Sequence, residues 1–376
     1  MMARRWLDRL TVAGFAGGLL LIGLLSMLIR SDAISRLENR ALAKFPGLAE
    51  LNSDWSAVPR QVNAWAEDHV IKRDVILRIN RKIRRDLRLE ETQQAVRGKD
   101  GWLFANLNQS LDMHTGKFSF DDDKAGRWVE SAGNLRDRVE AEGAVFAILI
   151  APNKATIHPE YLPQFPVSPT VQTPLERLET DLPKAGVLLV SPRERLETAA
   201  HAGQALYRKT DTHWSEWGAY LAYRDLMATL HKQGVKAPVL RDDALRVSDQ
   251  NGFRGDIYTL LGEPDGKPED TRRWAPAEPV RTLKTTRFPD LDFMAFEATR
   301  WTMETDNPER LLIIGDSFSY PILPFLKESF GEVTFVHHHL GEVPLEALQP
   351  ESYDVVILEM VERGLSRPLI VPPKTD

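Results

Sequence analysis

Three residues of this chain carry the side chains that acyl transfer through a serine requires, and the first is Ser317. The run Leu311-Leu312-Ile313-Ile314 leads directly into Gly315-Asp316-Ser317. A continuous apolar run predicts a strand covered on both faces of a parallel sheet. If a helix begins just after Gly315, free backbone N–H groups near Ser317 can stabilise an oxyanion. The alternative is that Asp316 or Ser317 simply caps that helix, a role both residue types favour.

The other two residues are Asp211 and His213, which are two positions apart in the stretch Thr210–Ser215. In an extended segment they point to the same side, so the carboxylate can hold one imidazole nitrogen and fix its tautomer. His213 can then accept the proton of Ser317, which completes a serine–histidine–aspartate arrangement. The alternative is that Asp211 fixes a turn and His213 is an ordinary surface histidine.

The segments around these residues alternate between strand and helix patterns. Helices are predicted over 126–142 and 215–232, and a loop over 262–280; strands are predicted over 145–150, 187–190, 310–314, 332–337 and 355–358. This alternation predicts an α/β domain with a mostly parallel central sheet flanked by helices. In such sheets a site forms beyond the carboxyl ends of the strands, where Ser317 is expected.

Composition narrows the classes of function. The 376 residues include 43% hydrophobic and 27% charged side chains, which is a globular composition, with a formal net charge of −6. An acidic chain of this kind argues against a nucleic-acid partner. It has no cysteine, which excludes thiolate nucleophiles, disulfides and cysteine metal sites. His337, His338 and His339 are consecutive, so on a strand they alternate faces and do not converge on one metal ion.

The N-terminus predicts a membrane anchor. Residues 10–29 are uncharged and long enough to span about 30 Å. Arg4, Arg5 and Arg9 precede them and Arg30 follows, which places the N-terminus in the cytoplasm and the rest of the chain across the membrane. A cleaved signal peptide is the alternative. We expect three parts: the cytoplasmic tip and anchor over 1–30, a helical approach segment over 31–95, and the catalytic domain over 96–376.

Together, Asp211-Thr212-His213-Trp214 and Gly315-Asp316-Ser317-Phe318 resemble the family of alginate O-acetyltransferases typified by AlgJ and AlgX, which have SGNH-hydrolase-like domains. The resemblance covers nearly the whole chain after the anchor. Further matching stretches are Glu38-Asn39-Arg40, Phe45-Pro46, 98–104, Pro152-x-Lys154, Gly218-Ala219, Gly255-Asp256 and Glu362-Arg363. In ordinary SGNH enzymes the Gly-Asp-Ser motif precedes the motif that carries the histidine, whereas in this chain it follows. The order of motifs in those enzymes therefore cannot be used to locate an oxyanion-hole asparagine here.

The resemblance implies a periplasmic polysaccharide O-acetyltransferase anchored in the inner membrane through residues 10–29. It implies Ser317 as nucleophile, His213 as general base and Asp211 as the residue that orients His213. It also implies a polysaccharide acceptor, a membrane-embedded acyltransferase that supplies acetyl groups, and other exopolysaccharide secretion proteins as partners. This chemistry needs neither a cofactor nor a metal.

Substrate contacts and the fate of the acyl group are less determined by the sequence. Trp214, Trp102 and Trp217 are candidates for stacking on sugars, with core packing as the alternative, and Lys154 is a candidate for binding an anionic substrate. A basic cluster from Lys72 to Arg88 favours a uronate-rich acceptor or lies on a solvated helix face.

The fate of the acyl group is also left open by the sequence. Capture of an acyl-serine by water makes an acetylesterase and capture by a sugar makes a transferase. A non-catalytic scaffold that binds polymer is the third hypothesis.

Overall fold

The computed structural model describes residues 94–163, 172–288, 298–337 and 353–369, together with 34–35, 40–41, 61–63 and 65. The chain divides into two compact units, one of residues 94–257 with 265–376 and one of residues 1–93 with 258–264. The second unit contains an antiparallel pair, β1 (Ile34–Ser35) and β2 (Arg40–Ala41). The predicted anchor at 10–29 and the basic cluster lie outside the described residues. Within the described residues, no helix is long and apolar enough to cross a bilayer.

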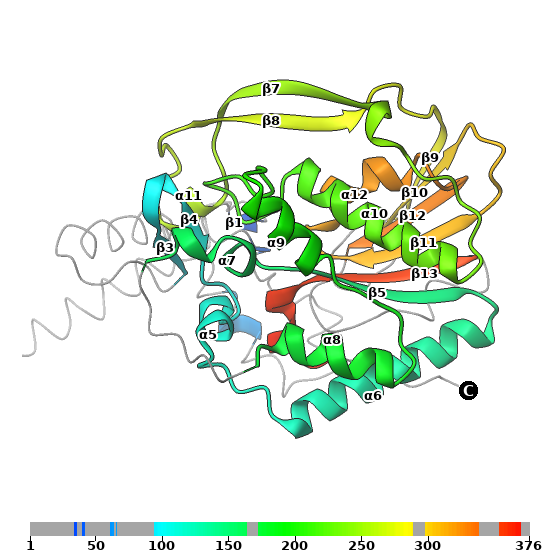
Figure 1. The fold of residues 1–376 in the computed structure, drawn as a ribbon, viewed down its shortest axis with the longest axis horizontal. Coiled ribbons are helices and arrows are strands. Elements are labelled where there is room, and N and C mark those ends of the chain that lie inside the picture. The colour runs from blue at the N-terminus through cyan, green and yellow to red at the C-terminus, as the bar shows by residue number, and fades with distance from the viewer. Residues whose placement is uncertain are drawn as a thin grey trace, which may run out of the picture. The chain divides into compact units, whose positions relative to one another are not determined.

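A seven-stranded sheet organises the larger unit (Figure 1). Its spatial order is β6 (Leu189–Val190), β5 (Val145–Ala151), β13 (Val355–Val361), β11 (Arg310–Gly315), β12 (Glu332–His337), β10 (Ala298–Met303) and β9 (Thr282–Phe288). Neighbours from β6 to β12 run parallel, whereas β10 is antiparallel to both β12 and β9. The α/β class is confirmed, but the sheet is mixed, so the prediction of a mostly parallel sheet is wrong.

The apolar run before Ser317 forms the middle strand of this sheet. Leu311 and Ile313 pack into the core beneath α10 (Glu216–Lys232) and α12 (Ser319–Leu326). Leu312 and Ile314 pack on the opposite face, against α6 (Asp122–Ala141) and α8 (Pro174–Lys184). Both faces of β11 are therefore covered, as its continuous apolar sequence predicts. Figure 1 shows the two helix layers on either side of the sheet.

Helix ends follow local chemistry. Ser215 caps α10 by accepting a hydrogen bond from the backbone N–H of Gly218, which agrees with the predicted helix over 215–232. Asp121 caps α6 in the same way, so this helix begins four residues before its predicted start at Gly126. Gly143 follows α6 with a positive φ of 86°, a conformation that favours glycine. The helices next to the site are thus fixed by their own sequences.

The remaining elements are short or peripheral. They are β3 (Ala95–Arg97), β4 (Leu103–Ala105), α5 (Ser110–Thr115), α7 (Lys154–Ile157), α9 (Arg193–His201), α11 (Ile257–Leu260), and four 3-10 helices: η1 (Lys99–Gly101), η2 (Pro159–Tyr161), η3 (Asp242–Ala244) and η5 (Glu362–Ser366). An antiparallel ribbon of β7 (Leu245–Phe253) and β8 (Glu269–Pro276) runs along the top of Figure 1, and β8 contacts α10. Because β8 lies within 262–280, the prediction of a loop there is wrong. The first five residues of β8 are all polar, so the strand has no apolar alternation to reveal it.

Candidate active site

The nucleophile turn, residues Gly315–Ser319, joins β11 to α12. The two oxygens of Asp316 accept backbone hydrogen bonds from Phe318, at 2.8 Å, and from Val361, at 2.9 Å. Asp316 therefore ties the turn to the end of β13. The helix begins at Ser319, and its N-cap position is held by Phe318 without a side-chain cap. The bond from Phe318 to the Asp316 carboxylate is the kind that caps a helix start, so the cap alternative holds for Asp316 but not for Ser317. The Ser317 hydroxyl is therefore available for another partner.

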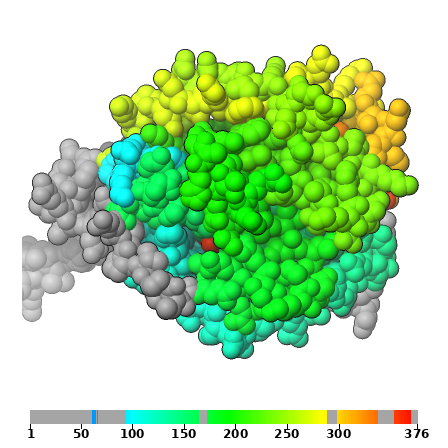
Figure 2. All heavy atoms as spheres, viewed as in Figure 1, coloured from blue at the N-terminus to red at the C-terminus, as the bar shows by residue number. Residues whose placement is uncertain are grey.

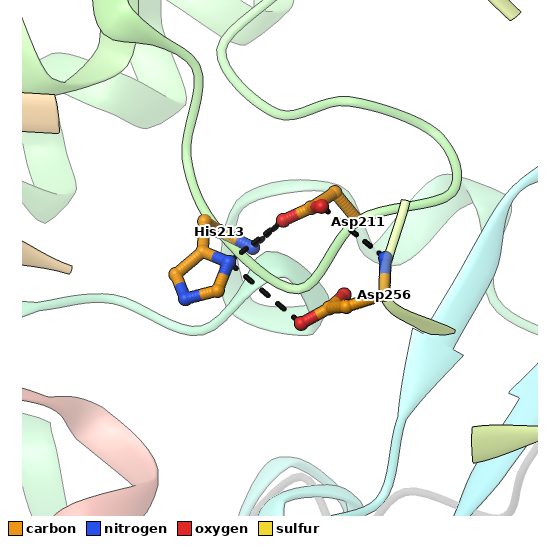
Figure 3. A group of neighbouring side chains, drawn as sticks. All are labelled: Asp211, His213 and Asp256. Carbon is orange, nitrogen blue, oxygen red and sulfur yellow. Dashed lines mark hydrogen bonds and ion pairs between the residues drawn. The ribbon is translucent and has the colours of Figure 1, made fainter. Parts of the chain in front are cut away.

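That partner is His213, so the structure brings the three predicted residues together. The Ser317 Oγ lies 2.8 Å from His213 Nε2, and His213 Nδ1 lies 2.7 Å from Asp211 Oδ1. Figure 3 shows Asp211 on the Nδ1 side of the ring, which leaves Nε2 free to face Ser317. With the proton on Nδ1 donated to Asp211, Nε2 is an acceptor for the serine hydroxyl proton. The geometry is that of a nucleophile, a base and an orienting carboxylate.

The sequence predicts that Asp211 and His213 meet in an extended segment. In the structure they meet through a turn. Asp211 Oδ1 accepts a hydrogen bond from the backbone N–H of His213 at 2.9 Å in addition to the ring contact. An aspartate that bonds the backbone two residues ahead is a common way of closing a turn. The loop of residues 207–214 is closed at its base by a bridge between Tyr207 and Trp214. One carboxylate thus fixes both the backbone and the imidazole of His213.

Asp256 is a further neighbour of His213, and the sequence indicates it only through the Gly255-Asp256 match to the family. Its Oδ2 lies 3.8 Å from His213 Nδ1, and its carboxylate accepts hydrogen bonds from the Thr212 backbone, at 2.8 Å, and hydroxyl, at 2.6 Å. Gly255 places it there, because a Cβ at Gly255 would overlap the Thr210 backbone. The Gly255-Asp256 match to the family was the available signal.

The same three residues form the candidate metal-binding cluster of the described residues. Asp211, His213 and Asp256 each offer a ligand atom, all within 4.8 Å of one another (Figure 3). The 2.7 Å between His213 Nδ1 and Asp211 is a hydrogen-bond distance, and the shared proton takes the position that a metal would need on that nitrogen. The arrangement therefore fits acid–base chemistry.

Charge within the cluster sets the protonation states. Burial alone would lower the pKa of His213, but the hydrogen bond and negative charge of Asp211, with Asp256, raise it above the usual value. Burial alone would raise the pKa of Asp211, yet its contacts with His213 lower it to about 2. Burial and the charge of Asp211 raise the pKa of Asp256. Asp211 is thus the ionised partner of His213.

Lys154 lies under the 207–214 loop and not in a substrate site. Its side chain is buried, with the residue 5% exposed, and Nζ donates to the carbonyls of Arg208 at 3.0 Å, Lys209 at 3.0 Å and Asp211 at 2.6 Å. Burial lowers the pKa of Lys154 to about 7, although nearby carboxylates favour its charged form. The prediction that Lys154 binds an anionic substrate is wrong, because its ammonium group is enclosed by the loop it supports.

Trp214 is also part of the interior. It is 0% exposed, and its indole N–H donates to the carbonyl of Phe318 at 2.9 Å, so it joins the histidine loop to the nucleophile turn. The prediction that Trp214 stacks on substrate is wrong, since no ring face is accessible to a sugar. Trp102 is 6% exposed, whereas Trp217 is half-buried.

Two buried acids support the site, Glu359 on β13 and Glu362 directly after it, at the start of η5. Glu359 Oε2 accepts hydrogen bonds from the Asp316 backbone at 3.1 Å and from the Ser319 hydroxyl at 2.6 Å. Glu362 Oε2 accepts from the Asn153 backbone at 2.7 Å and the Thr156 hydroxyl at 2.6 Å. Burial raises the pKa of Glu362 to about 7 and that of Glu359 well above its usual value. These acids hold the strand ends around Ser317.

The chain is similar in sequence to two curated proteins. The chain is 26% identical over 265 residues to the probable alginate O-acetylase AlgJ of Pseudomonas syringae, over 68% of this chain and 61% of that protein. It is 25% identical over 198 residues to the probable alginate O-acetylase AlgJ of Pseudomonas aeruginosa, over 49% of this chain and 48% of that protein. The match therefore spans less than two thirds of the length of either relative.

A solved structure supports the fold. The structure of Bacillus cereus PatB1 with a sulfonyl adduct is 19% identical, with a TM-score of 0.56, over 72% of this chain and 96% of that chain. In addition, the family described as SGNH hydrolase-like domain, acetyltransferase AlgX, matches residues 95–350, which is more than half of the chain and includes Asp211, His213 and Ser317. The chain therefore belongs to the AlgX family of SGNH hydrolase-like acetyltransferase domains.

Proposed function

We propose that this protein is an O-acetyltransferase that moves acetyl groups to hydroxyls of an exopolysaccharide, alginate or a similar polymer, through an acyl-serine at Ser317. The observation that carries the proposal is the hydrogen-bonded chain from Asp211 through His213 to Ser317, in a domain of this family. The names of the relatives point to acetylation of alginate by those proteins. Asp211, His213 and Ser317 are the residues to which the proposal assigns catalysis.

In the first half-reaction, Ser317 Oγ attacks the carbonyl carbon of the acetyl donor while His213 Nε2 takes the hydroxyl proton. Asp211 stabilises the imidazolium that results, since their hydrogen bond strengthens as positive charge develops. The backbone N–H of Ser317 is proposed as one donor to the oxyanion. When the tetrahedral intermediate collapses, the C–O bond to the leaving group breaks and His213 returns the proton to the leaving oxygen. The product is acetyl-Ser317.

In the second half-reaction, His213 accepts the proton of an incoming hydroxyl, whose oxygen attacks the acetyl-serine. Collapse breaks the bond to Ser317 Oγ and returns the proton to it. A sugar hydroxyl gives an acetylated polysaccharide, and water gives acetate. The outcome depends on whether the acceptor is positioned and water is excluded, because the same base activates both nucleophiles.

The cellular setting is part of the proposal and is supported by the sequence. Residues 10–29 anchor the chain in the inner membrane, and the catalytic domain faces the periplasm. Periplasmic polymer acetylation needs a source of acetyl groups on that side, so a membrane-embedded acyltransferase is the expected supplier. Other exopolysaccharide secretion proteins are the expected partners.

Product analysis tests the proposal. The purified chain is incubated with a small acetyl ester and oligosaccharides, and sugars and acetate are measured by mass spectrometry. Acetylated oligosaccharide from the native chain, and none from Ser317→Ala, is the expected result. Acetate without acetylated sugar assigns the acetylesterase alternative. If the native chain produces neither acetate nor acetylated sugar, the remaining hypothesis is a non-catalytic scaffold that binds polymer.

A further inference from the structure

A hollow among the described residues has a lining that does not include the three proposed catalytic residues, and we call it the Trp217–Trp274 groove. Its volume is about 770 Å³, and side chains of α10, β7, β8 and η2 contribute to its lining. This volume is in the range of sites that hold small ligands or short oligomers. Figure 2 shows the yellow atoms of the β7–β8 ribbon along the upper edge of the molecule, above the green atoms of the helices.

Two pairs of aromatic rings line the groove. The rings of Trp217 and Trp274 have centroids 4.5 Å apart and an angle of 33° between their planes. Tyr161 stacks on Trp102 with centroids 4.4 Å apart and planes 8° apart. Trp217, Trp274 and Tyr161 are half-buried, so each keeps part of its surface accessible. The polarised C–H groups of a pyranose face suit the negative face of an aromatic ring.

Two side chains of the groove lining carry a buried polar atom without a partner. His158 Nε2 and Arg208 Nε have no hydrogen-bond partner within the part of the chain that the structure describes. His158 is 4% exposed, its Nδ1 contacts Glu160 at 3.1 Å, and burial lowers its pKa, so in the neutral form Nε2 is an acceptor, whereas Arg208 Nε is a donor. Both atoms are themselves buried, so the proposal relies on the rings of the groove and not on these atoms.

The charges of the groove favour a neutral ligand over a polyanion. The carboxylates in its lining are those of Glu160, Asp249, Glu269 and Asp270, and the cations are Arg208, Lys209 and Arg272. Two of the cations are paired with carboxylates, Arg208 with Glu216 at 2.7 Å and Arg272 with Asp249 at 3.9 Å. Lys209 Nζ donates to the carbonyl of Asp100 at 3.1 Å and keeps its charge. A uronate chain would therefore meet the carboxylates of Glu160, Glu269 and Asp270 against the single charge of Lys209.

We propose that the Trp217–Trp274 groove binds a stretch of neutral glycan chain. The inference rests on the proposed function and narrows it: the bound glycan is part of the acceptor polymer, and that acceptor then carries neutral sugar residues and is not alginate, which is a polyuronate. The groove and the catalytic residues share the 207–214 loop, in which Arg208 and Lys209 line the groove and Asp211 and His213 follow. Glu269, on the groove side, accepts hydrogen bonds from the backbone of Lys209 at 3.0 Å and of Thr210 at 2.8 Å, which fixes that loop.

Calorimetric binding of a neutral β-1,4-linked glucose hexamer to the full chain, without an acetyl donor, tests the site. Trp274→Ala should weaken binding at least about tenfold, because a stacking ring is lost, and Trp274→Phe should retain most of the affinity. Trp301→Ala is the matched control, since Trp301 is half-buried on β10, outside the groove, and should bind like the native chain. Equal binding by Trp274→Ala and the native chain, or no binding by the native chain, overturns the proposal.

A charge comparison tests the preference for a neutral chain. A mannuronate hexamer of the same length should bind the native chain more weakly than the glucose hexamer. Asp249→Asn removes one carboxylate and releases Arg272, so it should tighten mannuronate binding several-fold and leave glucose binding nearly unchanged. Tighter binding of mannuronate than of glucose by the native chain contradicts the proposal.

These binding measurements are independent of turnover. Glycan binding that is lost in Trp274→Ala supports the groove even if no acetyl transfer is ever observed, in which case the proposed function fails alone. Acetyl transfer to a glucose hexamer that is as efficient in Trp274→Ala as in the native chain, with no measurable binding by either, overturns the groove and leaves the proposed function standing.

Discussion

Asp211 controls both the position and the protonation of His213. Its Oδ1 is 2.7 Å from Nδ1, whereas the nearest oxygen of Asp256 is 3.8 Å away. Burial opposes a charged imidazole, so the raised pKa of His213 depends on these carboxylates, and on Asp211 most of all. A base must be neutral to accept a proton, so the rate should fall as the pH drops through the raised pKa of His213.

Asp211→Asn should lower kcat/KM by about 10²–10⁴-fold and move the acid limb of the pH–rate profile to lower pH. The acid limb should move to lower pH because the substitution removes the charge that raises the pKa of His213 and leaves the burial that lowers this pKa. Asp256→Asn is the control and should shift the limb less, since its carboxylate is farther from Nδ1. The measurement is the pH dependence of acetyl-ester turnover. A limb that stays in place or rises in Asp211→Asn contradicts the assignment.

At the residue scale, the sequence was sufficient to predict that Ser317, His213 and Asp211 lie together, because reactive residue types occurred at informative spacings. It was insufficient for Lys154 and Trp214, which carry the same chemical groups whether they face a ligand or the interior. Their roles depend on burial, and burial depends on how the 207–214 loop folds over them. Asp256 was missed for the same reason, since its contact with His213 spans 43 residues.

The nucleophile turn is the element on which the site depends most. It is fixed from one side by the Asp316 carboxylate and from the other by Glu359. The backbone approaches Glu359 so closely at Gly315 that a Cβ there would overlap Glu359 Oε2 and Ser319 Oγ. Glycine is therefore required at this position by packing and not by its φ angle.

Gly315→Ala should destabilise the fold by about 1–3 kcal/mol through overpacking and reduce turnover by about 10²-fold through displacement of Ser317. Gly126 in α6 is the matched control, because a Cβ there meets no atom within 4 Å. Gly126→Ala should leave turnover unchanged and raise stability by about 0.5–1 kcal/mol. Urea unfolding and ester turnover measure both effects. A fully active Gly315→Ala protein would show that the turn tolerates movement.

Glu362, directly after the end of β13, should make the stability of the fold depend on pH. Burial raises the pKa of Glu362 from 4.5 to about 7, so the folded state binds this proton more tightly than the unfolded state does. Its contribution is present below pH 4.5 and is lost as the pH rises through about 7, by up to about 3 kcal/mol. Glu362→Gln keeps an oxygen acceptor for Asn153 and Thr156 but does not ionise. Between pH 5 and 8 the native chain should lose more unfolding free energy than Glu362→Gln; parallel curves contradict this account.

At the element scale, the strands that the sequence predicted well were the buried ones. β5, β11 and β13 have continuous apolar runs. The two predicted helices, α6 and α10, have capping residues and are followed by glycines. β9 and β8 were not predicted because their exposed side chains, such as Thr282, Lys284 and Arg272, carry no apolar pattern. The antiparallel edge that makes the sheet mixed is formed by β10 and β9. This edge can be recognised only from the pairing of the strands in the folded structure.

At the scale of the whole molecule, the site is assembled from segments far apart in the sequence. The base and its carboxylate come from the 207–214 loop, the nucleophile from the end of β11, and the buried acids from the end of β13. Trp214 and Lys154 join these segments from the inside. This arrangement explains why isolated motifs suggested the chemistry while the supporting residues required the folded structure.

The measurement that tests the account most directly is the mass of the chain during turnover. The full chain is mixed with an acetyl ester, quenched, and mapped by peptide mass spectrometry, with and without oligosaccharide added before the quench. The account predicts one acetyl group on Ser317, lost when acceptor is added, and none in Ser317→Ala or His213→Ala. Acetylation at another residue that passes to the sugar, or acetylated sugar produced by Ser317→Ala, would contradict it.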